Sequence, residues 1–269
     1  MSLLFNARMY SVNASAKADW KTLMAWVVQR AGLDWQALDH DAPAPLSALW
    51  ARDDLGMAMM CGLPFALSRP RPRLIAAPVP APQRYGGRPV YFTDFVVRAD
   101  AGYRNLEDTF DGVLGYTIPE SMSGGVAPYH HLAPLRHARG RRLFAGVVGD
   151  LLNGRGVIEA VASGRVDVGT LDSYYLDLLR RHDPAFAAQV RVVASTRAEP
   201  IPPLVATAAL SERQRGALRD ALLATGSAPE IAPLMQRLLL AGFAIVDARD
   251  YDHLADMATS ARTESFARL

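Results

Sequence analysis

Two serines followed by two glycines, in the segment YTIPESMSGGVAPYHHL at residues 116–132, could bind an anion. The segment follows a short apolar run and precedes a stretch that we predict to be helical, so its amides would lie at a helix N-terminus. Such a terminus carries unpaired N–H groups and about half a positive charge. The hydroxyls of Ser121 and Ser123 would add donors. Gly124 and Gly125 would let the backbone approach a ligand closely, because glycine has no side chain in the way. These residues predict a cradle for a phosphoryl-like or carboxylate group.

The same residues allow other interpretations. Serine is a common helix cap, so the turn could begin a helix without binding anything. A nucleotide-binding P-loop is not indicated, because no Gly-Lys-Ser follows the turn. Ser123 lacks the Gly-x-Ser-x-Gly context of a hydrolase nucleophile, so we expect no catalytic residue here. His130 and His131 are adjacent and would point in different directions on a helix, so we predict no metal site.

The overall composition favours a soluble globular protein with one large domain or two lobes. The 269 residues are 50% hydrophobic and 21% charged, which is enough for a substantial core. The 29 basic and 27 acidic residues leave a net charge of +2. We therefore expect no binding to nucleic acid, which requires a basic surface stripe. Among the basic residues, only Lys17 and Lys21 are lysines.

Cys61 is the only cysteine, which excludes an internal disulfide and a cysteine-based zinc cluster. The sequence contains no run of about 18 apolar residues that would predict a transmembrane helix. The apolar stretch in MSLLFNARMY is too short for a secretory signal. We therefore expect either a cytoplasmic protein or a chain whose export signal has been removed.

Short apolar strands alternate with amphipathic helices along the chain, which is typical of parallel sheets covered by helices. We predict strands in LLFNARMY, LGMAMMCGLPFAL, RLIAAPV, YFTDFVVR, DGVLGYT, LFAGVVGD, RVDVGTLDS and QVRVVAST. We predict helices in SVNASAKADWKTLMAWVVQRAG, after Gly125, in RGVIEAVASG, in SYYLDLLRRHD and in the tail from Ser211.

Ligands of such sheets bind beyond the carboxyl ends of the strands, where loops lead into helices. Polar or glycine-containing loops follow four of the predicted strands, at residues 10–11, 61–64, 120–125 and 172–175. We expect these four loops to converge on one crevice.

The segment SMSGGVAP has the form Ser-x-Ser-Gly-x-x-x-Pro and resembles the anion-binding turn of the phosphate/phosphonate-type substrate-binding proteins of ABC transporters. The resemblance continues in ARMY, MCGLPF, YFTDFVVRADAGYRNLEDTFDGVLGYTIPESMSGG, GVIEAVASGRVDVGTLDS and GFAIVDARDYDHL. These segments follow the order of the family and together cover most of the chain.

This resemblance implies an α/β fold of the two-lobed type 2 periplasmic-binding-protein class. Each lobe would be a mixed sheet flanked by helices, and two hinge strands would join the lobes. Lobe I would comprise residues 1–92 and 196–269, and lobe II residues 93–195. YFTDFVVR and QVRVVAST would be the hinge strands, and the ligand would lie in the cleft between the lobes.

The resemblance also implies which residues bind the ligand. The serine turn would hold the oxyanion, a carboxylate would face the ligand from the last strand of lobe II, and two turns of lobe I would close from the other side. The implied residues are Ser121, Ser123, Gly124 and Asp172 in lobe II, and Tyr10, Cys61 and Gly62 in lobe I.

Two further candidates lie on predicted helices of lobe II. Family members often carry a histidine in a Gly-Ser-His turn, where this sequence reads LLNGRGVIEAV. Arg155 either replaces that histidine as an oxyanion donor or is a solvated helix residue. Of Tyr174 and Tyr175 at most one can face the ligand, and Tyr174 is the candidate.

Glu120 lies immediately before the serines, and we expect it to point to solvent. If Glu120 and Asp172 both faced a fully ionised phosphate, they would repel it. In that case the ligand would also carry a cationic or hydrogen-bond-donating part, as an amino-alkyl phosphonate or a pyrimidine-like vitamin precursor does.

We predict a non-enzymatic solute-binding protein that captures a small oxyanion-bearing metabolite by hinge closure and presents it to an ABC permease. From the resemblance we expect it to be periplasmic, and we expect a monomer without a cofactor. Two alternatives stay open. One is binding or synthesis of a pyrimidine-type thiamine precursor on the same fold, with Asp172 or Glu120 as the base of an enzyme. The other is a cytosolic ligand sensor.

Overall fold

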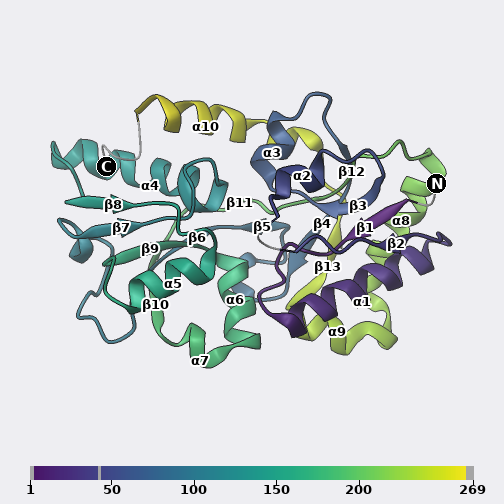
Figure 1. Ribbon diagram of the computed structural model, residues 1–269, viewed down its shortest axis with the longest axis horizontal. Coiled ribbons are helices and arrows are strands. Elements are labelled where there is room, and N and C mark those ends of the chain that lie inside the picture. Colours follow the sequence, from purple (N-terminus) through teal and green to yellow (C-terminus); the bar gives the residue numbers. More distant parts are fainter. Residues whose placement is uncertain (1–2, 42–43, 265–269) are drawn as a thin grey trace. The chain divides into compact units, whose positions relative to one another are not determined.

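Contacts between Cα atoms divide the chain into two units in the computed structural model, which describes residues 3–41 and 44–264. Unit 1 comprises the chain up to Val90 together with Pro200–Tyr251. Unit 2 comprises Tyr91–Glu199 together with the chain from Asp252 on. Each unit is built around a sheet of its own (Figure 1).

Six strands form the sheet in the described part of unit 1. They are β1 (Leu4–Asn6), β2 (Gln36–Ala37), β3 (Leu55–Met59), β4 (Arg73–Pro80), β12 (Leu204–Ala206) and β13 (Leu240–Ala244). Their order across the sheet is β13-β4-β12-β3-β1-β2. β1 is parallel to β2 and β3, whereas β12 is antiparallel to β3 and β4. β13 is antiparallel to β4, so the sheet is mixed.

Helices accompany this sheet, and the apolar spacing of the sequence explains the longest of them. In α1 the buried residues include Trp20, Leu23 and Val27, as their spacing predicts. Asn13 caps α1, because its side chain accepts a hydrogen bond from the N–H of Ala16 at 2.9 Å. The α-helices of unit 1 are α1 (Ala14–Arg30), α2 (Leu46–Trp50), α3 (Gly62–Leu67), α8 (Glu212–Ala224) and α9 (Ala232–Arg237). Its 3₁₀ helices are η1 (Gln83–Tyr85), η4 (Thr225–Ser227), η5 (Pro229–Ile231) and η6 (Ala248–Tyr251).

A five-stranded sheet forms the centre of unit 2 within the described residues. Its strands are β6 (Thr93–Arg98), β7 (Val113–Gly115), β8 (Gly146–Val148), β9 (Val168–Asp172) and β10 (Val190–Ser195). They are ordered β10-β6-β9-β7-β8. β7 is parallel to both β8 and β9, whereas β6 is antiparallel to β9 and β10.

In unit 2 a helix follows each of the three parallel strands, and the core includes Phe95, Leu114, Leu132 and Val168. A short π-helical turn, η3 (Met122–Val126), runs directly into α4 (Ala127–Arg139). The other helices are η2 (Glu107–Thr109), α5 (Gly154–Ala162), α6 (Ser173–His182), α7 (Pro184–Ala187) and α10 (His253–Glu264). Strands alternating with helices, as the sequence predicts, therefore build both units.

The passages of the chain between the units differ from the sequence-based expectation. The strands expected as hinges are β6 and β10, which pair with each other inside the sheet of unit 2. The chain instead passes from one unit to the other at β5 (Val90–Tyr91), at β11 (Glu199–Pro200), which pairs with β5, and after Tyr251.

The C-terminal helix also differs from expectation. Residues 196–269 were assigned to lobe I on the resemblance, yet α10 groups with unit 2. The reason is its packing, since Leu254, Met257 and Ala258 are buried and α10 contacts α4. The last five residues of that assignment, 265–269, lie outside the described residues.

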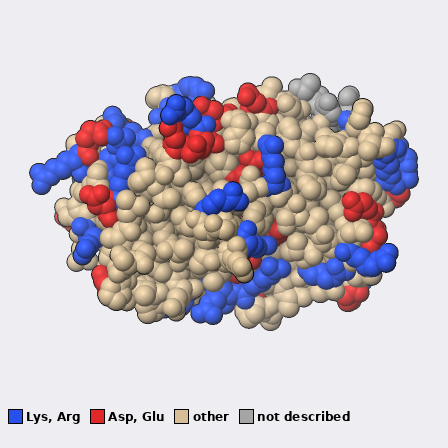
Figure 2. Space-filling model, turned by 180° about the vertical axis from the view of Figure 1, so that it is seen from behind, with Lys and Arg blue, Asp and Glu red and all other residues tan. Residues whose placement is uncertain are grey.

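Charge is interspersed on the surface that Figure 2 displays, where basic and acidic side chains alternate between wide uncharged areas. Within the described residues, every helix is too short or too polar to cross a membrane.

Candidate anion-binding site

Three loops meet at one edge of the sheet of unit 2. Because β7, β8 and β9 are parallel, their carboxyl ends lie at the same edge. β7 leads into η3, β8 leads into α5, and β9 leads into α6. The register pairs Gly115 with Gly169 and Thr93 with Asp172, so the serine turn and Asp172 follow neighbouring strands. Two of the four loops of the sequence prediction therefore lie at the same edge of this sheet, and their convergence on one crevice stays a prediction.

The serine turn is closed by Ser121. Its Oγ accepts a hydrogen bond from the N–H of Gly124 at 3.1 Å, which makes Ser121 the N-cap of η3. Its carbonyl oxygen accepts hydrogen bonds from the N–H groups of Gly125, at 2.8 Å, and Val126, at 3.0 Å. One residue therefore satisfies three of the amides that a helix start would otherwise leave unpaired.

Five other donors in this turn have no hydrogen-bond acceptor among the described residues. Two are the backbone N–H groups of Met122 and Ser123. The other three are the hydroxyl groups of Thr117, Ser121 and Ser123. The oxygen of Ser121 accepts the N–H of Gly124, but its own O–H donates to no described residue. All three hydroxyl-bearing residues are half-buried, so an anion could reach them from solvent. Donors gathered at a helix N-terminus favour negative charge.

Two threonines of the sheet fix the opposite side of the turn. Thr93 Oγ1 donates to the carbonyl of Ser123 at 2.8 Å, and Thr170 Oγ1 donates to the carbonyl of Gly124 at 2.9 Å. Both threonines are buried, with at most 1% of their surface exposed. Because these bonds hold the carbonyls toward the sheet, the N–H groups of the turn face the other way. Sequence reasoning missed both threonines, since nothing in an alternating strand distinguishes them.

The packing of the turn gives the glycines a purpose that the sequence analysis did not foresee. A Cβ at position 124 would lie 1.9 Å from Thr117 Oγ1, and one at position 125 would lie 2.4 Å from the carbonyl oxygen of Pro119. Neither glycine has a positive φ. The glycines therefore allow the loop before the turn to fold back against it. Thr117 is a further residue that the sequence analysis did not single out.

Asp172 caps the helix that follows its strand. Its Oδ1 accepts hydrogen bonds from the N–H groups of Tyr174 and Tyr175, at 2.9 and 3.0 Å. Tyr174 is fully buried, whereas Tyr175 keeps part of its surface exposed and packs over Gly154. Burial raises the pKa of Tyr175 to about 12; nearby Arg155 opposes this shift and the carboxylates of Asp172 and Glu159 add to it. Of the two tyrosines, the geometry leaves Tyr175 the more accessible.

Arg155 is engaged in contacts within unit 2. Its Nη2 lies 2.9 Å from Asp183 Oδ2, and its guanidinium carbon lies 3.9 Å from the centroid of the Phe186 ring. These contacts join α5 to the start of α7, so the guanidinium would have to leave Asp183 to bind an oxyanion. Glu120 is exposed, as expected.

The candidates of unit 1 lie on two loops that follow its parallel strands. Tyr10 follows β1, is buried and has a positive φ of 62°. Cys61 is the N-cap residue of α3 and is half-buried, and Gly62 is buried. Because β1 and β3 are parallel, both loops lie at the carboxyl edge of this sheet.

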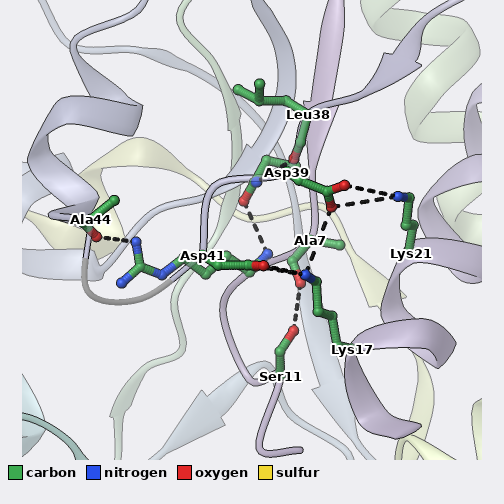
Figure 3. A network of polar contacts seen from close by, with 10 residues as sticks. Ala7, Ser11, Lys17, Lys21, Leu38, Asp39, Asp41 and Ala44 are labelled. Carbon is green, nitrogen blue, oxygen red and sulfur yellow. Dashed lines mark hydrogen bonds and ion pairs between the residues drawn. The ribbon is translucent and has the colours of Figure 1, made fainter. Parts of the chain in front are cut away.

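A polar network holds the chain on both sides of Tyr10 (Figure 3). Ser11 Oγ donates to the carbonyl of Ala7 at 2.7 Å, and Asn6 Nδ2 donates to the carbonyl of Leu38 at 2.8 Å. Lys17 Nζ lies 2.6 and 2.7 Å from the two carboxylate oxygens of Asp41. The hydrogen bond from Lys17 holds the pKa of Asp41 below its usual value and raises the pKa of Lys17.

Both lysines of the chain belong to this network, since Lys21 Nζ lies 3.4 Å from Asp39 Oδ1. Both lysines, Asp39 and Asp41 line a crevice that is open to solvent. No motif in the sequence predicted the network. It joins α1 to the segment after β2 and thereby orders the loop that carries Tyr10.

The described residues bring together no group of three histidine, cysteine or acidic side chains that could hold a metal ion.

Comparison with known proteins gives one family and several similar folds. Residues 10–251 match the sequence model of a family described as "ABC transporter, phosphonate, periplasmic substrate-binding protein". The phosphonates-binding periplasmic protein of Escherichia coli (strain K12) is 27% identical over 165 residues, 58% of this chain and 47% of that protein. The match thus spans about half the length of this curated relative.

Solved structures resemble the whole chain. A binding protein component of an ABC phosphonate transporter from Pseudomonas aeruginosa has a TM-score of 0.78 at 20% identity, covering 97% of this chain and 86% of that chain. A protein of Prochlorococcus marinus in complex with methylphosphonate has a TM-score of 0.77 at 14% identity, covering 97% of this chain and 98% of that chain. The predicted fold class, the type 2 periplasmic-binding-protein fold, is thereby confirmed.

Proposed function

The chain belongs to the family of periplasmic substrate-binding proteins of phosphonate ABC transporters, and we propose that it binds a small phosphonate- or phosphate-like metabolite for an ABC importer. The proposal includes a permease as partner, the periplasm as location and release of the ligand unchanged. The relative in Prochlorococcus marinus with methylphosphonate bound supports this ligand class.

The observation that carries the proposal is the set of unpaired donors in the serine turn. A phosphonate group has three oxygen atoms, each of which can accept more than one hydrogen bond. The turn offers the N–H groups of Met122 and Ser123 together with the hydroxyls of Thr117, Ser121 and Ser123. All of these donate without carrying a net charge, and hydrogen bonds to a charged acceptor are stronger than neutral ones.

Ser123 provides the clearest test, because its hydroxyl has no structural partner among the described residues. Isothermal titration calorimetry would compare methylphosphonate, 2-aminoethylphosphonate, phosphate and sulfate with the wild-type chain and with Ser123→Ala. We expect at least one phosphorus oxyanion to bind the wild type. The substitution should weaken it about ten- to a hundredfold, because a hydrogen bond to a charged group contributes about 1.5–3 kcal/mol.

Ser163→Ala is the matched control. Ser163 lies in the same unit as the serine turn, at the C-terminal end of α5, and its Oγ donates to the carbonyl of Ala160. Its removal should leave the affinity unchanged. The proposal is wrong if the wild type binds none of the three phosphorus oxyanions, or if both substitutions change the affinity equally.

Turnover is tested with the same samples. Phosphorus NMR of the bound anion after prolonged incubation should show only the starting compound. A new phosphorus species that depends on the protein would instead favour an enzyme on this fold.

A further inference from the structure

We propose that α10 is a positioning element for the serine turn and that it acts through His130 and Glu199, two residues outside that turn. This proposal rests on the proposed function, because the turn matters only if it binds a ligand. Figure 1 shows α10 lying along α4, and α10 contacts η3 as well. The helix therefore touches the segment that carries the unpaired donors.

The first attachment lies at the beginning of α4. His130 Nε2 is 2.9 Å from the carbonyl oxygen of Met257, in the middle of α10. A carbonyl can only accept, so Nε2 must carry the proton and donate it. His130 lies four positions after the end of η3, so this bond fixes the position of α10 next to the turn.

The second attachment holds the start of α10. Glu199 is 3% exposed, and its two carboxylate oxygens are each occupied. Oε1 lies 2.7 Å from Arg197 Nε, and Oε2 lies 2.6 Å from His253 Nε2, on the first residue of α10. Arg197 also reaches Met257, with 3.2 Å between its Nη2 and the sulfur atom. A buried carboxylate that loses its partners is costly, so this cluster resists displacement of the helix.

The apolar side chains of the turn are buried, and α10 is one of the elements that contact the turn. Met122 and Val126 are 3% and 2% exposed, although they lie in the turn that carries the unpaired N–H groups of Met122 and Ser123. η3 thus has a sheet contact through Thr93 and Thr170 and a helix contact through α10. If α10 shifted, η3 would keep its bonds to the sheet and its cap by Ser121, but it would lose the contact that α10 provides, so the donors would be less firmly oriented.

The experiment combines His130→Ala with hydrogen exchange and calorimetry. His130→Ala removes the bond to Met257, and His130→Gln restores an N–H donor at a similar reach. His137→Ala is the control, because His137 is an exposed histidine at the other end of α4. We expect His130→Ala to weaken methylphosphonate binding about two- to tenfold, as the loss of a net hydrogen bond implies. It should also speed amide exchange in residues 122–126.

His130→Gln should restore most of both properties, and His137→Ala should change neither. A lower melting temperature of His130→Ala with unchanged exchange in 122–126 would overturn the proposal, because the contact would then be merely structural. The exchange measurement needs no ligand. A wild type that binds no phosphorus oxyanion would therefore reject the proposed function, while exchange alone would still decide whether α10 positions the turn.

Discussion

The two serines of the turn have different roles at the scale of single residues. Ser121 Oγ already accepts the N–H of Gly124, so its removal would disturb the turn as well as any ligand. Ser123 Oγ makes no hydrogen bond to any described residue. The sequence could predict that both hydroxyls lie at a helix start. It could not predict this division, because the cap depends on the geometry of the following amides.

The first prediction at the scale of residues concerns the effect of Gly124 on stability. Its missing side chain leaves room for Thr117 Oγ1, which a Cβ would approach to 1.9 Å. We expect Gly124→Ala to lower the free energy of unfolding by about 1–3 kcal/mol, the usual cost of overpacking. Thr117→Ala in the same chain should recover part of this loss, because it removes the clashing atom. Urea unfolding of the wild type, Gly124→Ala and the double variant measures both effects.

Gly102→Ala is the control for this series, because a Cβ at position 102 meets no atom within 4 Å. If Gly124→Ala were no more destabilising than Gly102→Ala, the close packing of the turn against Thr117 would be disproved.

Arg155 and Tyr174 mark the limit of sequence reasoning about single residues. The sequence left open whether Arg155 binds an oxyanion or lies in solvent, and the structure adds a pairing with Asp183, 28 positions away along the chain. Tyr174 and Tyr175 are equivalent in a helical pattern, yet Tyr174 is buried and Tyr175 is partly exposed. Contacts between distant residues decide both cases, and a single sequence does not reveal them.

At the scale of elements, helix starts after parallel strands could be predicted well. The turn after β7 and the helix after β9 lie where the sequence placed them. The segment 55–67 was predicted as one strand with a final turn, but β3 ends at Met59 and α3 begins at Gly62. A short apolar run fits a buried strand and a buried helix equally, so periodicity could not separate the two.

The prediction at the scale of elements concerns the N-cap of α6. Asp172 caps this helix through Oδ1, and asparagine caps a helix about as well as aspartate does. Asp172→Asn should therefore preserve stability, whereas Asp172→Ala should cost about 1 kcal/mol. If the carboxylate also pairs with a cationic ligand group, both variants should weaken 2-aminoethylphosphonate about tenfold or more while sparing methylphosphonate.

Thermal unfolding and calorimetry on the two ligands separate capping from binding. Ser211→Ala serves as the reference, since it removes the capping box of α8 in unit 1 and should lower stability alone. Equal losses for both phosphonates in Asp172→Asn would contradict a specific pairing with the amino group.

At the scale of the whole molecule, alternation of strands and helices predicted sheets covered by helices, and the resemblance to the family predicted two α/β lobes. Neither was enough to assign α10, whose pattern of buried residues would suit either sheet. The polar contacts that tie α10 to the rest of unit 2 involve single atoms of His130, Glu199 and Met257. His130 and Met257 are 127 positions apart along the chain, so no local sequence pattern could predict their contact.

Hinge closure is the last prediction, and it belongs to the whole chain because the chain passes between the units at β5, at β11 and after Tyr251. A ligand can favour a closed form only by binding it more tightly than the open form, which requires contacts from both units. Small-angle X-ray scattering should therefore show a smaller radius of gyration when methylphosphonate saturates the wild type. Ser123→Ala at the same ligand concentration should keep the ligand-free value, because it should remain largely unoccupied. Saturation of the wild type in calorimetry without any change in scattering would mean that unit 2 binds the anion alone.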